Sequence, residues 1–328
     1  MALQPLPLAG IVLSAAIALF GSTCRGQSSG GDVTKDPGAS DTTAADVTLE
    51  GVDTSMLTPR EKKEWSAYVN EFLAPCSNTP VSVAQCVKEK RACDKCVPAA
   101  KYILKSVRDG EAREQVETSF KNRFDATKIK NVAIDDSPSR GPENASLVMV
   151  EFADFECPHC GLMAPRLDKA VDDRPNDVRF IYKFMPLKGH THAEPAARAA
   201  IAAWRQGKFW PMHHKLYAHQ MNLEQADLDS YAKDLGLDIS RFHADMQSKE
   251  TTDRIERDRK AADSLDVKGT PTIYINGREY DPQQDLNDWF TLELQMQGQK
   301  GGDAPKPVAP GSAAGITAPA SSMDSGKR

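Results

Sequence analysis

The sequence predicts an α/β domain with an inserted helical subdomain, and a small all-α module precedes this domain. Three observations lead to this prediction. Runs rich in β-branched and aromatic residues at 148–155 and 178–184, each followed by turn or helix-start signals, are typical of strands. A long helical region at 193–262 separates these runs from a hairpin signal at 272–280. A second helical pattern covers 58–124 and contains four cysteines.

Composition excludes several classes of protein. Hydrophobic residues make up 40% and charged residues 27% of the 328 residues, which is ordinary for a soluble globular protein. The formal net charge of −5 gives no electrostatic reason to bind nucleic acid, so we expect no nucleic-acid partner. The length allows one or two folded units with tails.

The N-terminus has features of an export signal. Residues 1–24 carry no charged side chain, and 7–20 form an apolar run that is short for a membrane-spanning helix. However, no Lys or Arg precedes the run, and 21–24 match a cleavage or lipidation box only loosely. We expect export to the periplasm or cell envelope. The alternatives are a lipid anchor at Cys24 or an uncleaved apolar anchor, and either would tether the protein to a membrane.

Composition also sets the expected domain boundaries. Residues 25–55 are rich in Gly, Ser, Thr and Asp and are predicted to be a flexible linker. Residues 298–328 are rich in Pro, Gly, Ala and Ser and are predicted to be a disordered tail. Between them we predict a four-cysteine module at 56–126 and the α/β domain at 130–297, with its helical insertion at 193–262.

Four helices are expected in the module. The first ends at Pro75. Thr79-Pro80 supplies an N-cap followed by proline at the first helical position, so a second helix begins there and runs through Cys93. Two further helices are expected at 99–107 and 111–124, separated by Asp109-Gly110.

The cysteine count favours disulfides. Of the seven cysteines, Cys24 belongs to the predicted leader, which leaves an even number of six. Six cysteines in an oxidising compartment are typical of disulfides, in agreement with export. In a reducing cytosol the same set would suggest metal binding instead. We expect disulfides and neither a metal nor a cofactor.

Helical geometry predicts how the module cysteines pair. If 81–93 is one continuous helix, Cys86 and Cys93 lie about 10.5 Å apart along its axis, too far for a disulfide. Cys86 and Cys96 would be farther apart. The predicted structural disulfides are therefore Cys76–Cys86 and Cys93–Cys96, although a kink before Pro98 would invalidate this argument.

Cys93 and Cys96 also form a Cys-x-x-Cys pair, which raises the alternative of a redox centre. The pair is predicted to lie at a helix C-terminus, where the helix dipole disfavours a thiolate, and Asp94 adds negative charge. A structural disulfide is therefore the preferred interpretation. The alternative is a relay that exchanges electrons with Cys157 and Cys160.

The strongest chemical signal is Cys157-Pro158-His159-Cys160, directly after the first predicted strand. A strand that leads into a helix places Cys157 at the helix N-terminus, where free N–H groups and the dipole stabilise negative charge. Pro158 suits the first helical turn, and His159 can add positive charge. Such sites stabilise a thiolate, so their disulfide form is oxidising. We expect Cys157 to be the exposed, attacked sulfur and Cys160 the buried one.

Two alternatives to a redox site are open at this stage. The two cysteines could form an inert structural disulfide. They could also be half of a zinc site completed by one of two histidine pairs, His190 with His192 or His213 with His214. A second motif, Val267-Lys268-Gly269-Thr270-Pro271-Thr272, weakens both alternatives.

Together, E-F-A-D-F-E-C-P-H-C-G and V-K-G-T-P-T-I-Y-I-N-G resemble the DsbA-like branch of the thioredoxin superfamily over about residues 146–295. The resemblance implies a thioredoxin fold with an inserted helical subdomain. It also implies a cis bond at Pro271, in a loop that faces the redox cysteines. The Thr270 backbone would then pair with a substrate strand.

The resemblance further assigns Glu151 as a buried acid beneath the active site. A buried carboxyl group with a raised pKa can relay protons during exchange. Strand alternation puts Glu151 on the face shared with Ala153 and Phe155. The alternative is an exposed charge at a strand edge.

These observations predict a thiol–disulfide oxidoreductase that oxidises cysteines in exported proteins and is regenerated by an unidentified redox partner. Thr270 before the proline is closer to isomerase and reductase branches, so isomerisation or reduction is the first alternative. The second is a non-catalytic thioredoxin-fold protein that binds peptides as a scaffold or chaperone.

Overall fold

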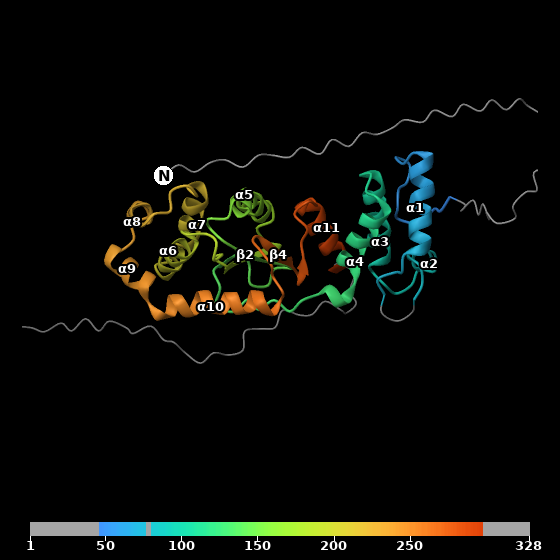
Figure 1. Cartoon of the computed structure of the whole chain (residues 1–328). Coiled ribbons are helices and arrows are strands. Elements are labelled where there is room, and N and C mark those ends of the chain that lie inside the picture. Colours follow the sequence, from blue (N-terminus) through green and yellow to red (C-terminus); the bar gives the residue numbers. More distant parts are fainter. Residues whose placement is uncertain (1–45, 77–79, 298–328) are drawn as a thin grey trace, which may run out of the picture. The chain divides into compact units, whose positions relative to one another are not determined.

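A computed structural model describes residues 46–76 and 80–297 (Figure 1). The predicted leader, residues 25–45 of the predicted linker and the predicted tail lie outside the described residues. Within the described ranges, no helix is long and apolar enough to cross a membrane.

The N-terminal module is helical, as predicted. Over the described residues up to 128 it contains α1 (Pro59–Glu71), α2 (Val83–Lys88), α3 (Cys96–Arg108), α4 (Arg113–Phe124) and a single 3₁₀ turn, η1 (Ala126–Lys128). Thr58 caps α1 through a reciprocal pair of hydrogen bonds with Glu61. Trp65 is fully buried and its indole N–H donates to the Ala100 carbonyl, which ties α1 to α3.

Part of the predicted linker is ordered. Val47, Leu49 and Val52 are buried in the same hydrophobic cluster as Trp65. The Val47 N–H donates to the Ser66 hydroxyl at 3.0 Å. Residues 46–55 therefore belong to the module, because three spaced apolar side chains are enough to join its core. Their polar neighbours hid this signal in the sequence.

Helix α2 is shorter than the sequence predicts. It ends at Lys88 because Lys90 adopts a positive φ of 47°. The Arg91 N–H then donates to the Cys86 carbonyl at 3.2 Å, which is the hydrogen bond of a Schellman helix end. The chain reverses at this point, so the premise of a continuous helix through Cys93 is wrong.

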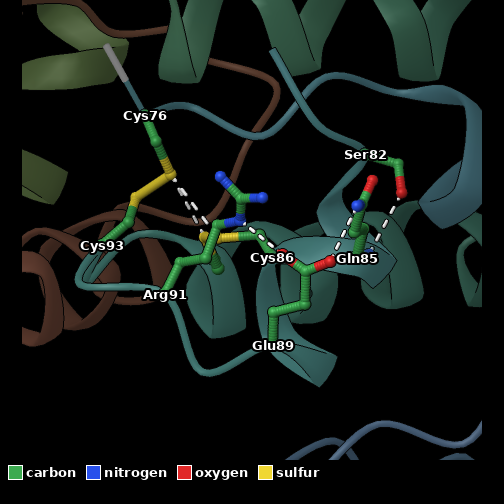
Figure 2. Close-up of a disulfide and its surroundings, with 8 residues drawn as sticks. Cys76, Ser82, Gln85, Cys86, Glu89, Arg91 and Cys93 are labelled. Carbon is green, nitrogen blue, oxygen red and sulfur yellow. Dashed lines mark hydrogen bonds and ion pairs between the residues drawn. A yellow bond between two sulfur atoms is a disulfide. The ribbon is translucent and has the colours of Figure 1, made fainter. Parts of the chain in front are cut away.

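The predicted disulfide pairing is therefore also wrong. The bridges are Cys76–Cys93 and Cys86–Cys96, with Cα–Cα separations of 5.9 and 6.0 Å (Figure 2). The reversal after α2 returns the chain past Cys76 and Cys86. As a result Cys96 is the first residue of α3 and does not lie at a helix C-terminus.

The second part of the chain is built on a mixed sheet. Its described strands are β1 (Ser139–Arg140), β2 (Leu147–Ala153), β3 (Val178–Phe184), β4 (Thr272–Ile275) and β5 (Arg278–Glu279). Their order is β1-β3-β2-β4-β5. Only β2 and β3 pair in parallel, and α5 (Pro158–Asp172) connects them. Asn276 and Gly277, both at positive φ, form the predicted tight turn between β4 and β5.

Helices cover both faces of this sheet. One face packs against α5 and α11 (Leu286–Gln297), through Leu167 and Phe290 among others. The other face packs against the end of α10 (Lys249–Ser264), through Phe152, Tyr274 and Ala262. Figure 1 shows α5 and α10 on opposite sides of β2 and β4. Strand β2 is therefore buried at every residue except the partly buried Val148, which sets the environment of the residues that follow it.

The predicted helical region is confirmed and divides into separate helices. The described elements are α6 (Ala193–Arg205), α7 (Phe209–Ala218), α8 (Gln225–Asp234), α9 (Ile239–Gln247) and α10. The aromatic residues of α7 pack into a cluster that also contains Phe155, Cys157 and Cys160. The predicted fold class, an α/β domain with a helical insertion after a four-cysteine all-α module, is confirmed.

Candidate redox active site

The two cysteines of the motif lie where β2 leads into α5. Strand β2 ends at Ala153, a turn follows, and Cys157 is the N-cap residue of α5 in an extended conformation. Pro158 occupies the first helical position, where a missing N–H costs no hydrogen bond. Cys157 and Cys160 are both free thiols, so this is the dithiol form of the site.

Helix geometry gives the two thiols opposite acidities. Hydrogen bonds from the Cys160 thiol and from backbone N–H groups of α5 lower the pKa of Cys157 to about 4, and they outweigh the opposing effect of burial. Burial raises the pKa of Cys160 far above its ordinary value, and the charge of Glu151 adds to this effect. At neutral pH the pair therefore holds one thiolate, on Cys157, and one thiol, on Cys160.

We expected Cys157 to be exposed and Cys160 to be buried, but the structure shows only a small difference between them. Cys157 is 4% exposed and Cys160 is fully buried. The prediction of an exposed Cys157 is therefore wrong, since the residue is nearly covered in this form.

The loop before β4 faces Cys157, as the resemblance implies. The Thr270–Pro271 bond is cis. The Cys157 thiol lies 3.3 Å from the Thr270 carbonyl oxygen, across 113 residues of sequence. The carbonyl that would pair with a substrate strand therefore lies next to the reactive sulfur.

An apolar pocket of about 320 Å³ opens beside the cysteines. Its lining includes His159 and Met163 from α5, together with Thr270, Pro271 and Pro282. Leu162, which is 72% exposed, and Arg166 complete the lining. The pocket could hold an apolar side chain of a peptide next to Cys157.

Glu151 is buried beneath the site. It is completely inaccessible, and neither carboxyl oxygen has a hydrogen-bond partner among the described residues. Burial raises the pKa of Glu151 to about 8, with a further contribution from the charge of Asp168. The alternative of an exposed strand-edge charge is therefore wrong, and Glu151 is protonated in most molecules at pH 7.

Two supports of the active-site turn were not found from the sequence. Gln220 donates from its side-chain amide to the carbonyls of Phe155 and Cys157, at 2.8 and 2.9 Å. Its amide also fills the space beside Gly161, where a Cβ would lie 2.0 Å from the Gln220 oxygen. No sequence pattern marks Gln220, because it lies 59 residues beyond Gly161 in the helical insertion.

The second support is Asp154, which is buried and accepts the N–H groups of Glu156 and Leu187. The same carboxylate contacts His190 at 2.7 Å, and this hydrogen bond raises the pKa of His190. Asp154 therefore fixes the turn that presents Cys157. Asp154 could have been found from the sequence, because an aspartate often accepts a hydrogen bond from the backbone N–H two residues later, here that of Glu156.

The histidines considered as zinc ligands have other neighbours. His190 and His192 contact carboxylates on the active-site turn. His213 is buried among aromatic rings, and burial lowers its pKa to about 3. In the described parts of the chain, the groups of side chains close enough to hold a metal ion do not include Cys157 or Cys160.

Comparisons with known proteins agree with this geometry. Residues 133–292 match the family model described as thioredoxin. An Na⁺/H⁺ antiporter, NhaA 3 of Salinispora tropica, is 44% identical over 142 residues, which are 43% of this chain and 22% of that protein. The NhaA antiporter of Herminiimonas arsenicoxydans is 36% identical over 167 residues, 51% of this chain and 27% of that protein. This chain thus spans about a quarter of the length of these relatives.

Two solved structures illustrate the likeness. A thioredoxin-like oxidoreductase from Silicibacter pomeroyi is 30% identical and covers 47% of this chain and 90% of its own, with a TM-score of 0.43. BdbD from Bacillus subtilis is 24% identical and covers 52% and 98%, with a TM-score of 0.46. The family match begins after the four-cysteine module and does not include it. Residues 133–292 therefore form a thioredoxin-superfamily domain that resembles the DsbA-like branch.

Proposed function

We propose that this protein is a thiol–disulfide oxidoreductase that oxidises pairs of cysteines in exported proteins. The observation that carries the proposal is the opposite acidity of the two thiols, with the pKa of Cys157 lowered to about 4 and that of Cys160 raised. A stabilised thiolate favours the reduced form of the site, so the disulfide form gives up its bond readily to a substrate.

The first step starts from the disulfide form. A substrate thiolate attacks the Cys157 sulfur, the Cys157–Cys160 bond breaks, and a mixed disulfide forms. Cys160 leaves as the weaker acid and takes up a proton, because its pKa lies far above neutral. Glu151 is the proposed donor, since a carboxyl group with a pKa of about 8 carries a proton at pH 7 and lies close enough to affect the Cys160 pKa.

The second step releases the product. The second thiolate of the substrate attacks the substrate sulfur of the mixed disulfide, and Cys157 leaves as a thiolate. A low pKa makes Cys157 a good leaving group. The substrate has then lost two electrons and the site has gained them. A separate redox partner must remove these electrons to restore the Cys157–Cys160 disulfide.

The proposed substrate-binding residues are Thr270 and Pro271. The Thr270 carbonyl contacts the Cys157 sulfur in the dithiol form. When Cys157 is bonded to a substrate sulfur, this carbonyl becomes free to accept an N–H from an extended substrate strand. The apolar pocket beside it would hold a neighbouring substrate side chain.

Export to the periplasm or cell envelope, with a membrane tether through the N-terminus, belongs to the same proposal.

The test is the oxidation of a reduced dithiol peptide by stoichiometric protein, with Cys157→Ser and Cys160→Ser compared. We expect rapid oxidation by the natural protein and none by Cys157→Ser. Cys160→Ser should instead be given the oxidised peptide: the Cys157 thiolate attacks the peptide disulfide, one peptide thiol is released, and the mixed disulfide accumulates because Cys160 is absent to resolve it. If the dithiol form reduced an oxidised peptide faster than the disulfide form oxidised a reduced one, the isomerase or reductase alternative would be favoured. Thr270 is the residue that supports this alternative. Equal peptide binding by all three proteins without exchange would contradict the proposal and favour a scaffold.

A further inference from the structure

The four cysteines of the module form one compact cluster of sulfurs. The four Sγ atoms all lie within 4.8 Å of one another. The Cys76 sulfur, although bonded to Cys93, is 3.6 Å from that of Cys86 and 3.3 Å from that of Cys96. Figure 2 shows the two bridges side by side, with Cys76 directed at the second bridge. The two disulfides are therefore in van der Waals contact.

The two bridges differ in their access to solvent. Cys76 and Cys93 are half-buried. Cys86 and Cys96 are 1% and 3% exposed, so their bridge lies behind the first. An external thiol can reach the outer bridge, Cys76–Cys93, and is shielded from the inner bridge, Cys86–Cys96. Exchange between the inner bridge and an external thiol therefore needs an intermediate sulfur.

We propose that this cluster is a second thiol–disulfide exchange centre, in which Cys76 passes an attack on the outer bridge to the inner bridge. A thiolate of an external dithiol attacks Cys93, the Cys76–Cys93 bond breaks, and a mixed disulfide forms on Cys93. Cys76 leaves as a thiolate already in contact with the inner bridge.

Cys76 then attacks Cys86. A Cys76–Cys86 bond forms, the Cys86–Cys96 bond breaks, and Cys96 leaves as a thiolate. Cys96 is the better leaving group of the inner pair, because it is the first residue of the 13-residue helix α3, where the dipole stabilises negative charge. Cys86 lies inside α2 and lacks this stabilisation.

The second thiolate of the external dithiol completes the reaction. It attacks its own partner sulfur in the mixed disulfide, and Cys93 leaves. The external dithiol has lost two electrons and becomes a disulfide. The cluster has gained them as the free thiols of Cys93 and Cys96, with Cys76–Cys86 as the remaining bridge. Of the two protons of the dithiol, one stays on Cys93 and the other passes to Cys96 or to water.

The backbone suits both the Cys76–Cys86 bridge of this product and its reoxidation by closure of a Cys93–Cys96 bridge. The Cys96 N–H donates to the Cys93 carbonyl at 3.3 Å, so the two residues span one turn. Residues at the two ends of such a turn have Cα atoms less than about 7 Å apart, within reach of a reversible disulfide. Cys76 and Cys86 already have adjacent sulfurs. The module can thus hold two connectivities without a large movement of its backbone.

The test is the connectivity of the two-electron-reduced cluster. A full-length chain with serine at the three cysteines outside the cluster is treated, folded, with one equivalent of dithiothreitol. It is then quenched in acid, labelled with N-ethylmaleimide and mapped by mass spectrometry. We expect most two-electron-reduced molecules to carry label on Cys93 and Cys96 and a Cys76–Cys86 bridge. Label on Cys76 and Cys93 with an intact Cys86–Cys96 bridge would overturn the proposal.

Two matched variants test the role of Cys76. Cys93→Ser and Cys76→Ser each remove the outer bridge and one sulfur. In Cys93→Ser we expect Cys76 to form a bridge with Cys86 and leave Cys96 open to labelling. In Cys76→Ser the Cys86–Cys96 bridge should persist. Equal persistence or equal loss of that bridge in the two variants, with far-UV circular dichroism like that of the parent chain, would contradict the relay.

Discussion

Glu151→Gln should change how the stability of the dithiol form depends on pH. The pKa of Glu151 is raised from 4.5 to about 8 by complete burial. The folded protein therefore holds this proton more tightly than the unfolded chain does. The stability associated with the proton is fully present below pH 4.5 and is lost as the pH rises to about 8.

The magnitude follows from the separation of the two pKa values. They differ by about 3.5 pH units, and each unit corresponds to about 1.4 kcal/mol. Because each group is half-titrated at its own pKa, the free energy of unfolding of the natural protein should fall by about 4 kcal/mol relative to Glu151→Gln between pH 4.5 and 8. A neutral amide of similar shape has no proton to lose, so the variant lacks this contribution.

Urea unfolding of both proteins at pH 5, 6, 7 and 8, under reducing conditions, measures the difference. Other groups that titrate, such as Cys157, are present in both proteins and largely cancel. The prediction concerns how this difference changes with pH. The buried amide of Glu151→Gln adds a cost of its own, and that cost is the same at every pH. A difference in unfolding free energy that stays constant across this range would refute the assignment of a buried, protonated Glu151.

Three further substitutions test other contacts. Cys160→Ala removes the main hydrogen bond to the Cys157 thiolate and should raise the Cys157 pKa from about 4 by about one to two units, as followed by thiolate absorbance at 240 nm; an unchanged titration would contradict this. Gln220→Ala removes two hydrogen bonds to the active-site turn and should lower the unfolding free energy by about 1–3 kcal/mol in urea, whereas a neutral effect would show that the turn holds itself. Asp258→Ala removes the acceptor of the buried Phe184 N–H and one of the two carboxylates beside the buried Lys183, whose other partner is Asp135 at 3.1 Å. It should destabilise the fold by about 1–3 kcal/mol, and unchanged stability in thermal unfolding would contradict this.

Strong local signals made part of the fold predictable. Strand β3 was predicted at its observed bounds, 178–184, because the segment is rich in β-branched and aromatic residues despite its two basic residues. Asn276-Gly277 predicted its turn because both residues accept positive φ. Pro158 fixed the start of α5 for a similarly local reason.

The errors come from features without a local signal. The end of α2 depends on Lys90 at positive φ, a conformation that sequence patterns assign to glycine or asparagine. The chain reverses at this residue, and both observed disulfides therefore differ from the predicted ones. The contacts of Gln220 join residues more than 60 positions apart, so only the fold brings them together. The candidate site residues inside the two motifs were predictable, whereas Gln220, which supports them from the helical insertion, was not.

The central claim is that a stabilised Cys157 thiolate makes the Cys157–Cys160 disulfide oxidising. With a pKa of about 4 in place of 9, the thiolate stabilises the reduced form about a thousandfold at pH 7, which corresponds to about 90 mV. The direct measurement is the equilibrium reduction potential of this pair in glutathione buffers at pH 7, read by alkylation and mass spectrometry of its peptide. A potential near the −120 mV typical of strong dithiol oxidants, roughly −120 to −180 mV, is predicted. A potential near about −270 mV, as in thioredoxin, would contradict the account.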